Sequence, residues 1–228
     1  MKTLYNKIII YDDVCPLCKA YTSGFVNLGW LLPDHRVGFS DASPELLASI
    51  DIDRARHEIP LYDTLTKETL YGKEALFYLL GEEFPVYKPL FQFAPFRFII
   101  HGLYQIITYN RRIIAGSKSP TCGFDCAPDF NGFYRWFYIG LAALVSLMIG
   151  IFQIETWTMP VIGFYIVVLI GVIKGLFVPD FIAKTDYYGH LATVLLLLHI
   201  LSAMVGFSGL ALAVLVPISA YLLARRIR

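Results

Sequence analysis

The stretch KIIIYDDVCPLCKAY, residues 7–21, joins an apolar run to two aspartates and then to two cysteines three residues apart. Residues 7–11 are rich in β-branched side chains and end in polar residues, a pattern typical of a buried strand. Pro16 follows the first cysteine, and proline suits the first position of a helix because its missing N–H has no partner there in any case. We therefore expect a strand over 7–11 and a helix over 16–31, with the cysteines at their junction.

The two cysteines of this junction have the spacing of a redox pair. Cys15 is expected at or next to the N-cap of the helix, where free N–H groups and the helix dipole favour an anion and lower the pKa of a thiol. Cys18 lies one turn further on the same face, within reach of a disulfide. Cys15 would attack a substrate disulfide, and Cys18 would resolve the mixed disulfide. A structural or metal-binding pair is the alternative.

Asp12 and Asp13 stand directly before the cysteines. A carboxylate beside Cys15 raises the pKa of the thiol and so opposes the helix terminus. Asp12 ends the strand, and a buried carboxylate at that place is expected to relay the proton that Cys18 loses during resolution. For Asp13, a solvated turn residue or a helix cap is the simpler interpretation.

The residues that follow predict a compact mixed α/β domain. A strand is expected in RVGFSDA and a helix in SPELLASI, where a serine, a proline and an early glutamate form a helix start. Further downstream we expect strands over 61–64 and 69–71 and a helix over 73–80. The predicted order of elements is therefore β-α-β-α-β-β-α.

This order, the Cys-Pro-Leu-Cys motif after the first strand and Ile59-Pro60 before the third resemble the thioredoxin superfamily in its glutaredoxin-like form. The Asp-x-x-Cys-x-x-Cys opening and YNRR at 109–112 are similar more specifically to the DCC family of thiol-disulfide oxidoreductases. The resemblance covers the N-terminal half of the chain, up to YNRR or shortly beyond it. Asp13 departs from the family pattern, which usually has glycine at that place.

The resemblance implies which residues bind the substrate. Pro60 would be a cis-proline beside the dithiol, and Ile59 and Pro16 would flank the bound peptide or glutathione, which pairs with the exposed backbone like a short strand. A trans-proline at the start of an edge strand is the alternative. The partner would be a disulfide-containing protein or a small thiol, and no cofactor is required.

The second half of the chain has the composition of a membrane domain. Residues 133–228 carry only 9 acidic and basic residues, against 28 in residues 1–132, and the whole chain is 57% hydrophobic. Four apolar runs come near the roughly 20 residues that cross a bilayer. They are Tyr134–Ile154, Met159–Val178, Tyr187–Val205 and Leu210–Ala224. The net charge is only +1, and no basic run predicts binding to nucleic acid.

The predicted domains are 1–82 for the redox domain, 83–132 for an interfacial helical extension with a cysteine-containing linker, and 133–228 for a four-helix transmembrane domain. Packing of the extension onto the redox domain is the alternative to an interfacial position. Basic residues lie before the first span, around the middle link and at the C-terminus; they are Arg111, Arg112, Lys118, Arg135, Lys174, Lys184, Arg225, Arg226 and Arg228. By the positive-inside rule, both termini are expected in the cytoplasm, and in a bacterium the protein would lie in the inner membrane.

Three more residues are candidates for redox or cofactor chemistry. Cys122 and Cys126 form Cys-x-x-x-Cys in the linker, which allows a second redox pair, a Cys₄ zinc site together with Cys15 and Cys18, or two structural cysteines. No metal site is predicted, because this half of the motif matches zinc knuckles poorly. His199 lies deep in the third span, where a contact to a quinone or a proton path competes with a hydrogen-bonded interior histidine.

Three functional hypotheses follow. The first is a membrane-anchored thiol-disulfide oxidoreductase with its dithiol in the cytoplasm, where a reducing environment favours reduction of the substrate. The second is a redox coupler that passes electrons between the dithiol and a quinone. The third is a non-enzymatic assembly subunit whose helices dock onto another membrane protein.

Overall fold

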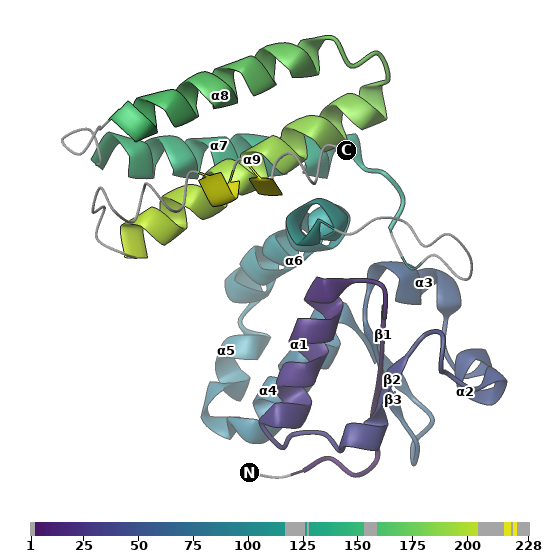
Figure 1. The fold of residues 1–228 in the computed structure, drawn as a ribbon. Coiled ribbons are helices and arrows are strands. Elements are labelled where there is room, and N and C mark those ends of the chain that lie inside the picture. Colours follow the sequence, from purple (N-terminus) through teal and green to yellow (C-terminus); the bar gives the residue numbers. More distant parts are fainter. Residues whose placement is uncertain are drawn as a thin grey trace. The chain divides into compact units, whose positions relative to one another are not determined.

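The computed structural model describes residues 3–116, 126, 128–152, 159–204, 217–219 and 221–222. The chain divides into two compact units, Met1–Asp129 and Phe130–Arg228, and each is described by itself (Figure 1). Helices make up most of the described residues, and the first unit also contains a small mixed sheet.

The sheet of the first unit has four strands. They are β1 (Lys7–Tyr11), β2 (Arg36–Gly38), β3 (Pro60–Asp63) and β4 (Thr69–Tyr71). Their order across the sheet is β2-β1-β3-β4, with β2 parallel to β1 and the other two pairs antiparallel. The predictions for β1 and β4 are confirmed to the residue, and β3 begins one residue earlier than predicted.

Helices join and flank the strands of this sheet. They are α1 (Pro16–Asn27), the 3-10 turn η1 (Pro33–His35), α2 (Pro44–Ala48), α3 (Ile52–His57) and α4 (Gly72–Glu83). The predicted Ser43 cap of α2 is confirmed, because its side chain accepts a hydrogen bond from Leu46 N at 3.2 Å. Helix α3 was not predicted, although Asp51 caps it in the same way, with Oδ1 3.0 Å from Arg54 N.

The two faces of the sheet bury different side chains, as the period of two along a strand requires. On one face Ile9 and Leu61 pack with α1 and α4. On the opposite face the next residues along the same strands, Ile10 and Tyr62, pack with side chains of the α2–α3 region. The side chains of these two clusters form the hydrophobic core of the first unit.

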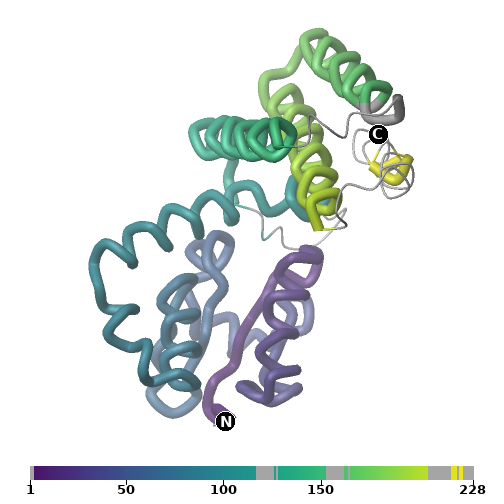
Figure 2. Tube along the Cα trace, turned by 90° about the vertical axis from the view of Figure 1, so that its left-hand side faces the viewer, coloured from purple at the N-terminus to yellow at the C-terminus, as the bar shows by residue number. Residues whose placement is uncertain are grey.

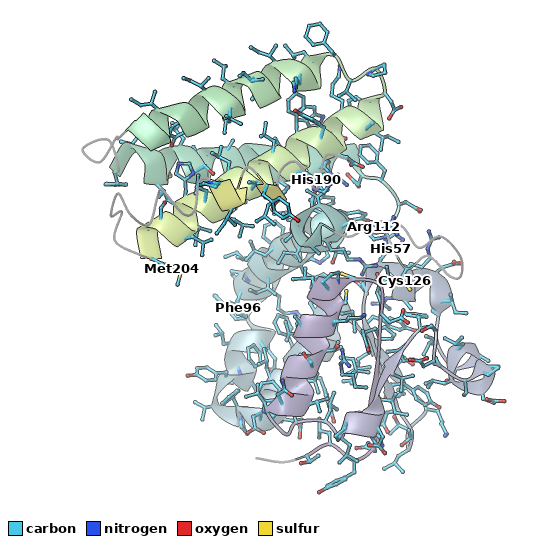
Figure 3. The ribbon with its side chains drawn as sticks, viewed as in Figure 1. His57, Phe96, Arg112, Cys126, His190 and Met204 are labelled. Atoms are coloured by element: carbon cyan, nitrogen blue, oxygen red, sulfur yellow. The ribbon has the colours of Figure 1, made fainter. Side chains whose placement is uncertain are left out.

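Residues 83–116 continue the first unit as helices: the 3-10 turn η2 (Pro85–Tyr87), α5 (Lys88–Gln92) and α6 (Ala94–Ala115). Near the start of α6, Arg97 forms an ion pair with Glu74 of α4 at 2.6 Å, and Phe96 lies near Phe77 (Figure 3). Helix α6 also packs against α1. Its C-terminal half buries Thr108, Asn110, Arg111 and Ile113. The extension therefore contributes side chains to the interior of the first unit.

The described part of the second unit contains α7 (Gly132–Phe152), α8 (Met159–Leu176) and α9 (Phe181–Met204). Helices α7 and α9 lie side by side (Figure 2). By length and apolar composition, α7 and α9 can each cross a membrane. The described side chains of α8 begin at Ile162, and the predicted fourth span over 210–224 lies mostly outside the described residues, as do the C-terminal arginines.

The third predicted span begins six residues earlier than the hydropathy pattern indicated. Asp180 caps α9, with Oδ2 2.7 Å from Ala183 N, so the helix includes the charged Lys184 and Asp186. Asp186 pairs with Arg135 of α7, and Tyr138 of α7 bonds to Thr193 of α9 at 2.7 Å. These polar contacts join the first two turns of α7 to residues 186–193 of α9.

Candidate functional site

The two cysteines of the opening motif lie at the junction of β1 and α1. Cys15 is the N-cap of α1, with extended backbone angles, and Pro16 is the exposed first helical residue. The Cys15 sulfur accepts a hydrogen bond from Cys18 N at 3.4 Å. Both side chains are thiols and both are buried, with 2% of Cys15 and 5% of Cys18 exposed. The predicted position of Cys15 at the helix N-terminus is confirmed.

Asp12 shapes the loop that carries Cys15. Its Oδ1 accepts hydrogen bonds from Val14 N at 3.0 Å and from Cys15 N at 3.2 Å. The side chain is buried directly after the last residue of β1. The carboxylate thus fixes the backbone at the position from which the thiol of Cys15 projects. Asp13 instead points to Ser40 and hydrogen-bonds with its hydroxyl.

Arg111 completes the site from a distant part of the chain. This residue of α6 is 5% exposed, and its Nη2 lies 3.2 Å from Asp12 Oδ2. Its Nη1 donates to the sulfur of Cys18 at 3.8 Å, and Nη2 also donates to the carbonyl oxygens of Arg56, at 3.2 Å, and of Cys126. The guanidinium therefore connects the carboxylate, the second thiol and two backbone carbonyls.

Sequence reasoning did not assign Arg111 to the site. The residue was counted among the basic residues before the first span, and YNRR served only to support the family resemblance. Ninety-three positions separate Arg111 from Cys18, and no local pattern indicates such a contact. The one signal in the sequence was that YNRR, which contains Arg111, supported the same family resemblance as the cysteine motif.

The arrangement separates the pKa values of the two thiols. The hydrogen bonds from Cys18 and the charge of Arg111 lower the pKa of Cys15 to about 6, against the opposing effects of burial and of Asp12. The pKa of Cys18 is raised, first because its proton is held in the hydrogen bond to Cys15 and then because the thiol is buried. At neutral pH the pair therefore consists of a Cys15 thiolate and a protonated Cys18.

Ile59 lies beside the dithiol, while Pro60 is fully buried at the start of β3. Ile59 packs against the cluster of Tyr11, Cys15 and Cys18. The expectation of a cis-proline is wrong for this structure, because no peptide bond in the described residues is cis. Pro60 instead follows a trans peptide bond and opens β3 opposite Tyr71 of β4, but β3 lies between β1 and β4 and is not the edge strand that the alternative supposed.

Helix α6 also supports the segment around Ile59. Burial raises the pKa of Tyr104 in α6 to about 12, while a hydrogen bond to the Ile59 backbone acts in the opposite direction. A Cβ atom at Gly72 would meet the Tyr104 hydroxyl at 3.0 Å, and Gly72 has a φ of +55°. Glycine is therefore needed where α4 begins, so that the tyrosine can reach the backbone next to the dithiol.

The second cysteine pair is only partly described. Cys122 lies outside the described residues, so its pairing with Cys126 stays a prediction. Cys126 is buried, and it packs on the sheet face of Ile10 and Tyr62 and not in the cluster of Cys15 and Cys18 (Figure 3). Its contact with the site is made by its backbone carbonyl, which accepts a hydrogen bond from Arg111.

Asp12, Cys15 and Cys18 also form a set of potential metal ligands. One ligand atom from each lies within 4.8 Å of the others, and zinc binds thiolate and carboxylate ligands. However, the Arg111 guanidinium already contacts both Asp12 and Cys18. A divalent cation would have to displace this buried positive charge, so the donor set fits a dithiol better than a metal site.

His199 lies in the second unit, in α9. Its Nε2 hydrogen-bonds with the Tyr165 hydroxyl of α8 at 2.7 Å, and its Nδ1 lies 2.8 Å from the carbonyl oxygen of Leu195. The imidazole is 3% exposed and lines a cavity between α7, α8 and α9. The structure therefore places His199 in a hydrogen-bonded interior position that also faces a cavity.

The chain was compared with protein families, curated proteins and solved structures. No family model, curated protein or solved structure matches it.

Proposed function

We propose that this chain is a thiol-disulfide oxidoreductase of the thioredoxin-like DCC type, anchored in a membrane by its helical unit. The observation that carries the proposal is the position of Cys15. Its sulfur caps α1, accepts a hydrogen bond from Cys18 N, and has a pKa of about 6 beside a second thiol whose pKa is raised. Such a pair of thiols is suited to attack and resolution of a disulfide.

The fold of the first unit supports the thioredoxin-like assignment. Helix α1 follows β1 directly, β2 lies parallel to β1, and β3 and β4 complete the sheet as an antiparallel pair. The dithiol lies where β1 ends and α1 begins, beside the Ile59–Pro60 segment that opens β3. Helices cover both faces of the sheet, as in other α/β folds.

The reaction proceeds in two exchanges. The Cys15 thiolate attacks one sulfur of a substrate disulfide, which forms a mixed disulfide and releases the other substrate sulfur as a thiolate. Cys18 then loses its proton and attacks the Cys15 sulfur, which releases the reduced substrate and leaves a Cys15–Cys18 disulfide. Two electrons have passed to the substrate, and two molecules of a thiol such as glutathione reduce the protein disulfide again.

Arg111 and Asp12 would act on the second exchange. Cys18 becomes an anion as it attacks, and the Nη1 of Arg111 already lies 3.8 Å from its sulfur. Asp12 holds the guanidinium in this position, and a carboxylate oxygen lies within 4.8 Å of both sulfurs, a distance over which one water would carry the proton of Cys18 to it. In this proposal Cys15, Cys18 and Asp12 are the catalytic residues, and Arg111 stabilises the developing thiolate.

The membrane assignment is supported by α7 and α9, the two helices among the described residues that are long and apolar enough to cross a bilayer. The basic residues around the apolar runs favour a cytoplasmic position for the dithiol and for both termini. A reducing compartment would keep the pair as dithiol, so we propose reduction of a disulfide-containing protein or small molecule.

The test is a thiol count by mass-shift alkylation of the purified full chain, titrated against a glutathione redox buffer. Wild type is compared with Cys18→Ser, Cys15→Ser and a Cys122→Ser/Cys126→Ser double variant. We expect Cys15 and Cys18 to titrate together, and Cys18→Ser to trap glutathione on Cys15. The double variant should leave this titration unchanged unless a relay connects the two cysteine pairs.

Two results would contradict the proposal. Thiols that stay reduced across the whole redox range would exclude exchange, and a non-enzymatic subunit would then be the better hypothesis. Thiols that react only after a chelator is added would indicate a metal site. In either case Cys18→Ser would fail to accumulate the mixed disulfide.

A further inference from the structure

The second unit contains a cavity that the dithiol does not use. Its volume is about 440 Å³, within the range of pockets that bind small molecules. Five of its lining residues come from one stripe of α7, spaced as residues on one helix face; they are Ala143, Ser146, Leu147, Gly150 and Ile151. Tyr165 of α8 and Leu195 and His199 of α9 line the remainder.

Ser146 is the feature of this cavity that points to a ligand. Its side chain is 2% exposed, and its hydroxyl has no hydrogen-bond partner in the part of the chain that the structure describes. A hydroxyl at this position in a helix usually bonds to a backbone carbonyl of the preceding turn. A buried polar group without a partner costs free energy, which a ligand with a hydrogen-bonding oxygen would remove.

A second polar group faces the same space. Nδ1 of His199 lies 2.8 Å from the Leu195 carbonyl oxygen, which can only accept, so Nδ1 carries a proton. In the neutral imidazole Nε2 is then an acceptor, and the hydroxyl of Tyr165 donates to it at 2.7 Å. The pair is thus held in one orientation by α8 and α9, opposite the stripe on α7.

Gly150 brings α7 close to this pair. A Cβ atom at Gly150 would lie 3.2 Å from the Tyr165 hydroxyl and 3.3 Å from His199 Nε2. Ser146 lies one turn away on the same face of α7. The Tyr165–His199 pair therefore packs directly against the backbone of Gly150, one turn from Ser146, so the polar groups lie near one another in an otherwise apolar cavity.

We propose that this cavity binds a lipid-soluble ring compound with a carbonyl oxygen, of the quinone class, with Ser146 donating a hydrogen bond to that oxygen. The apolar walls match an apolar ring, and helices that can cross a membrane give access to a ligand dissolved in lipid. Polar groups buried in membrane helices commonly mark such sites. The inference concerns binding alone and does not depend on the proposed dithiol reaction.

The test is binding of a benzoquinone with a ten-carbon tail to the full chain in detergent, with decanol as a lipid alcohol of similar length. Wild type should bind the quinone saturably, and decanol should not compete. Ser146→Ala should weaken binding by about tenfold, the scale of one lost hydrogen bond. The same substitution should leave the thermal unfolding midpoint of the ligand-free protein unchanged or raise it, because it removes an unpartnered hydroxyl.

Two glycine variants provide a matched pair. Gly150→Ala should abolish binding because its methyl group displaces the Tyr165–His199 pair, whereas Gly140→Ala on the same helix should not, because a Cβ there has nothing within 4 Å. Cys15→Ser should leave the affinity unchanged, which separates this inference from the dithiol proposal. Absence of saturable binding, an unchanged affinity in Ser146→Ala, or equal competition by decanol would overturn the assignment.

Discussion

Both ends of β1 carry a buried ion pair, and the two pairs differ in what surrounds them. At the start of the strand Lys7 pairs with Asp63 of β3, and their side chains are 8% and 7% exposed. Just beyond its end Asp12 pairs with Arg111 of α6, with side chains 10% and 6% exposed. Each pair joins residues far apart in the sequence.

The groups bonded to each ion pair show why only the Asp12–Arg111 pair belongs to the candidate site. Asp63 accepts hydrogen bonds from Asn6, from Leu65 N and from Thr66 N in addition to Lys7, so groups of the sheet and its turn saturate the carboxylate. At the other end the cation is shared with the sulfur of Cys18, a group that can change its charge. A buried ion pair alone therefore does not indicate function, but one beside a titratable thiol does.

The largest expected effect is that of Arg111→Met. The substitution leaves the carboxylate of Asp12 buried without its cation, which typically costs about 3 to 5 kcal/mol of stability. Hydrogen exchange of the full chain should show this loss in peptides that cover β1 and α1.

Arg97→Met is the control for Arg111→Met on the same helix. Arg97 pairs with Glu74 where the side chains are 37% and 35% exposed, so about 0 to 1 kcal/mol is expected. If both substitutions lowered the free energy of unfolding equally, the Asp12–Arg111 pair would stabilise the fold no more than an exposed ion pair does.

Asp63→Asn also leaves a buried charge, that of Lys7, without its carboxylate, but the effect should be smaller, about 1 to 3 kcal/mol, because the amide keeps one acceptor oxygen and Lys7 keeps its contact with the ring of Tyr78. Burial raises the pKa of Asp63, but hydrogen bonds from Lys7, Leu65 N, Asn6 and Thr66 N outweigh it, so the pKa is lowered. Its stabilising effect is therefore present above the usual pKa of about 3.9 and is lost as the pH falls through the folded-state pKa.

Hydrogen exchange at pH 7 and under mild acid would check this dependence. Wild type should lose protection of β1 and β3 as the pH falls below about 4, and Asp63→Asn should lose less over the same range. An equal loss in both proteins would show that other carboxylates cause the acid sensitivity.

The smallest effect concerns the reactivity of Cys15. The alkylation rate in wild type should reach half its maximum near pH 6, where the thiol ionises. Arg111→Met should move this midpoint upward by less than about one pH unit, because hydrogen bonds from Cys18 lower the pKa more than Arg111 does. Rates measured on a Cys122→Ser/Cys126→Ser background exclude alkylation of those two cysteines from the measurement. A midpoint that stays near pH 9 in wild type would contradict the proposed nucleophile.

Local chemistry made much of the first unit predictable. A β-branched run determined β1, Pro16 after Cys15 determined where α1 begins, and Ser43 determined where α2 begins. The thiol pair and its place at the helix N-terminus followed from spacing alone. Two helix starts were missed although their signals are also local: Asp51 caps α3, and Asp180 caps α9.

Tertiary structure decided everything that depends on residues distant in the chain. The contact of Arg111 with Asp12 and Cys18, the trans peptide bond before Pro60 and the meeting of Ser146, Tyr165 and His199 around one cavity are of this kind. The physical reason is range. Capping and periodicity depend on residues that are close together in the sequence. A buried charge or a cavity, in contrast, is created only when helices from different parts of the chain pack together.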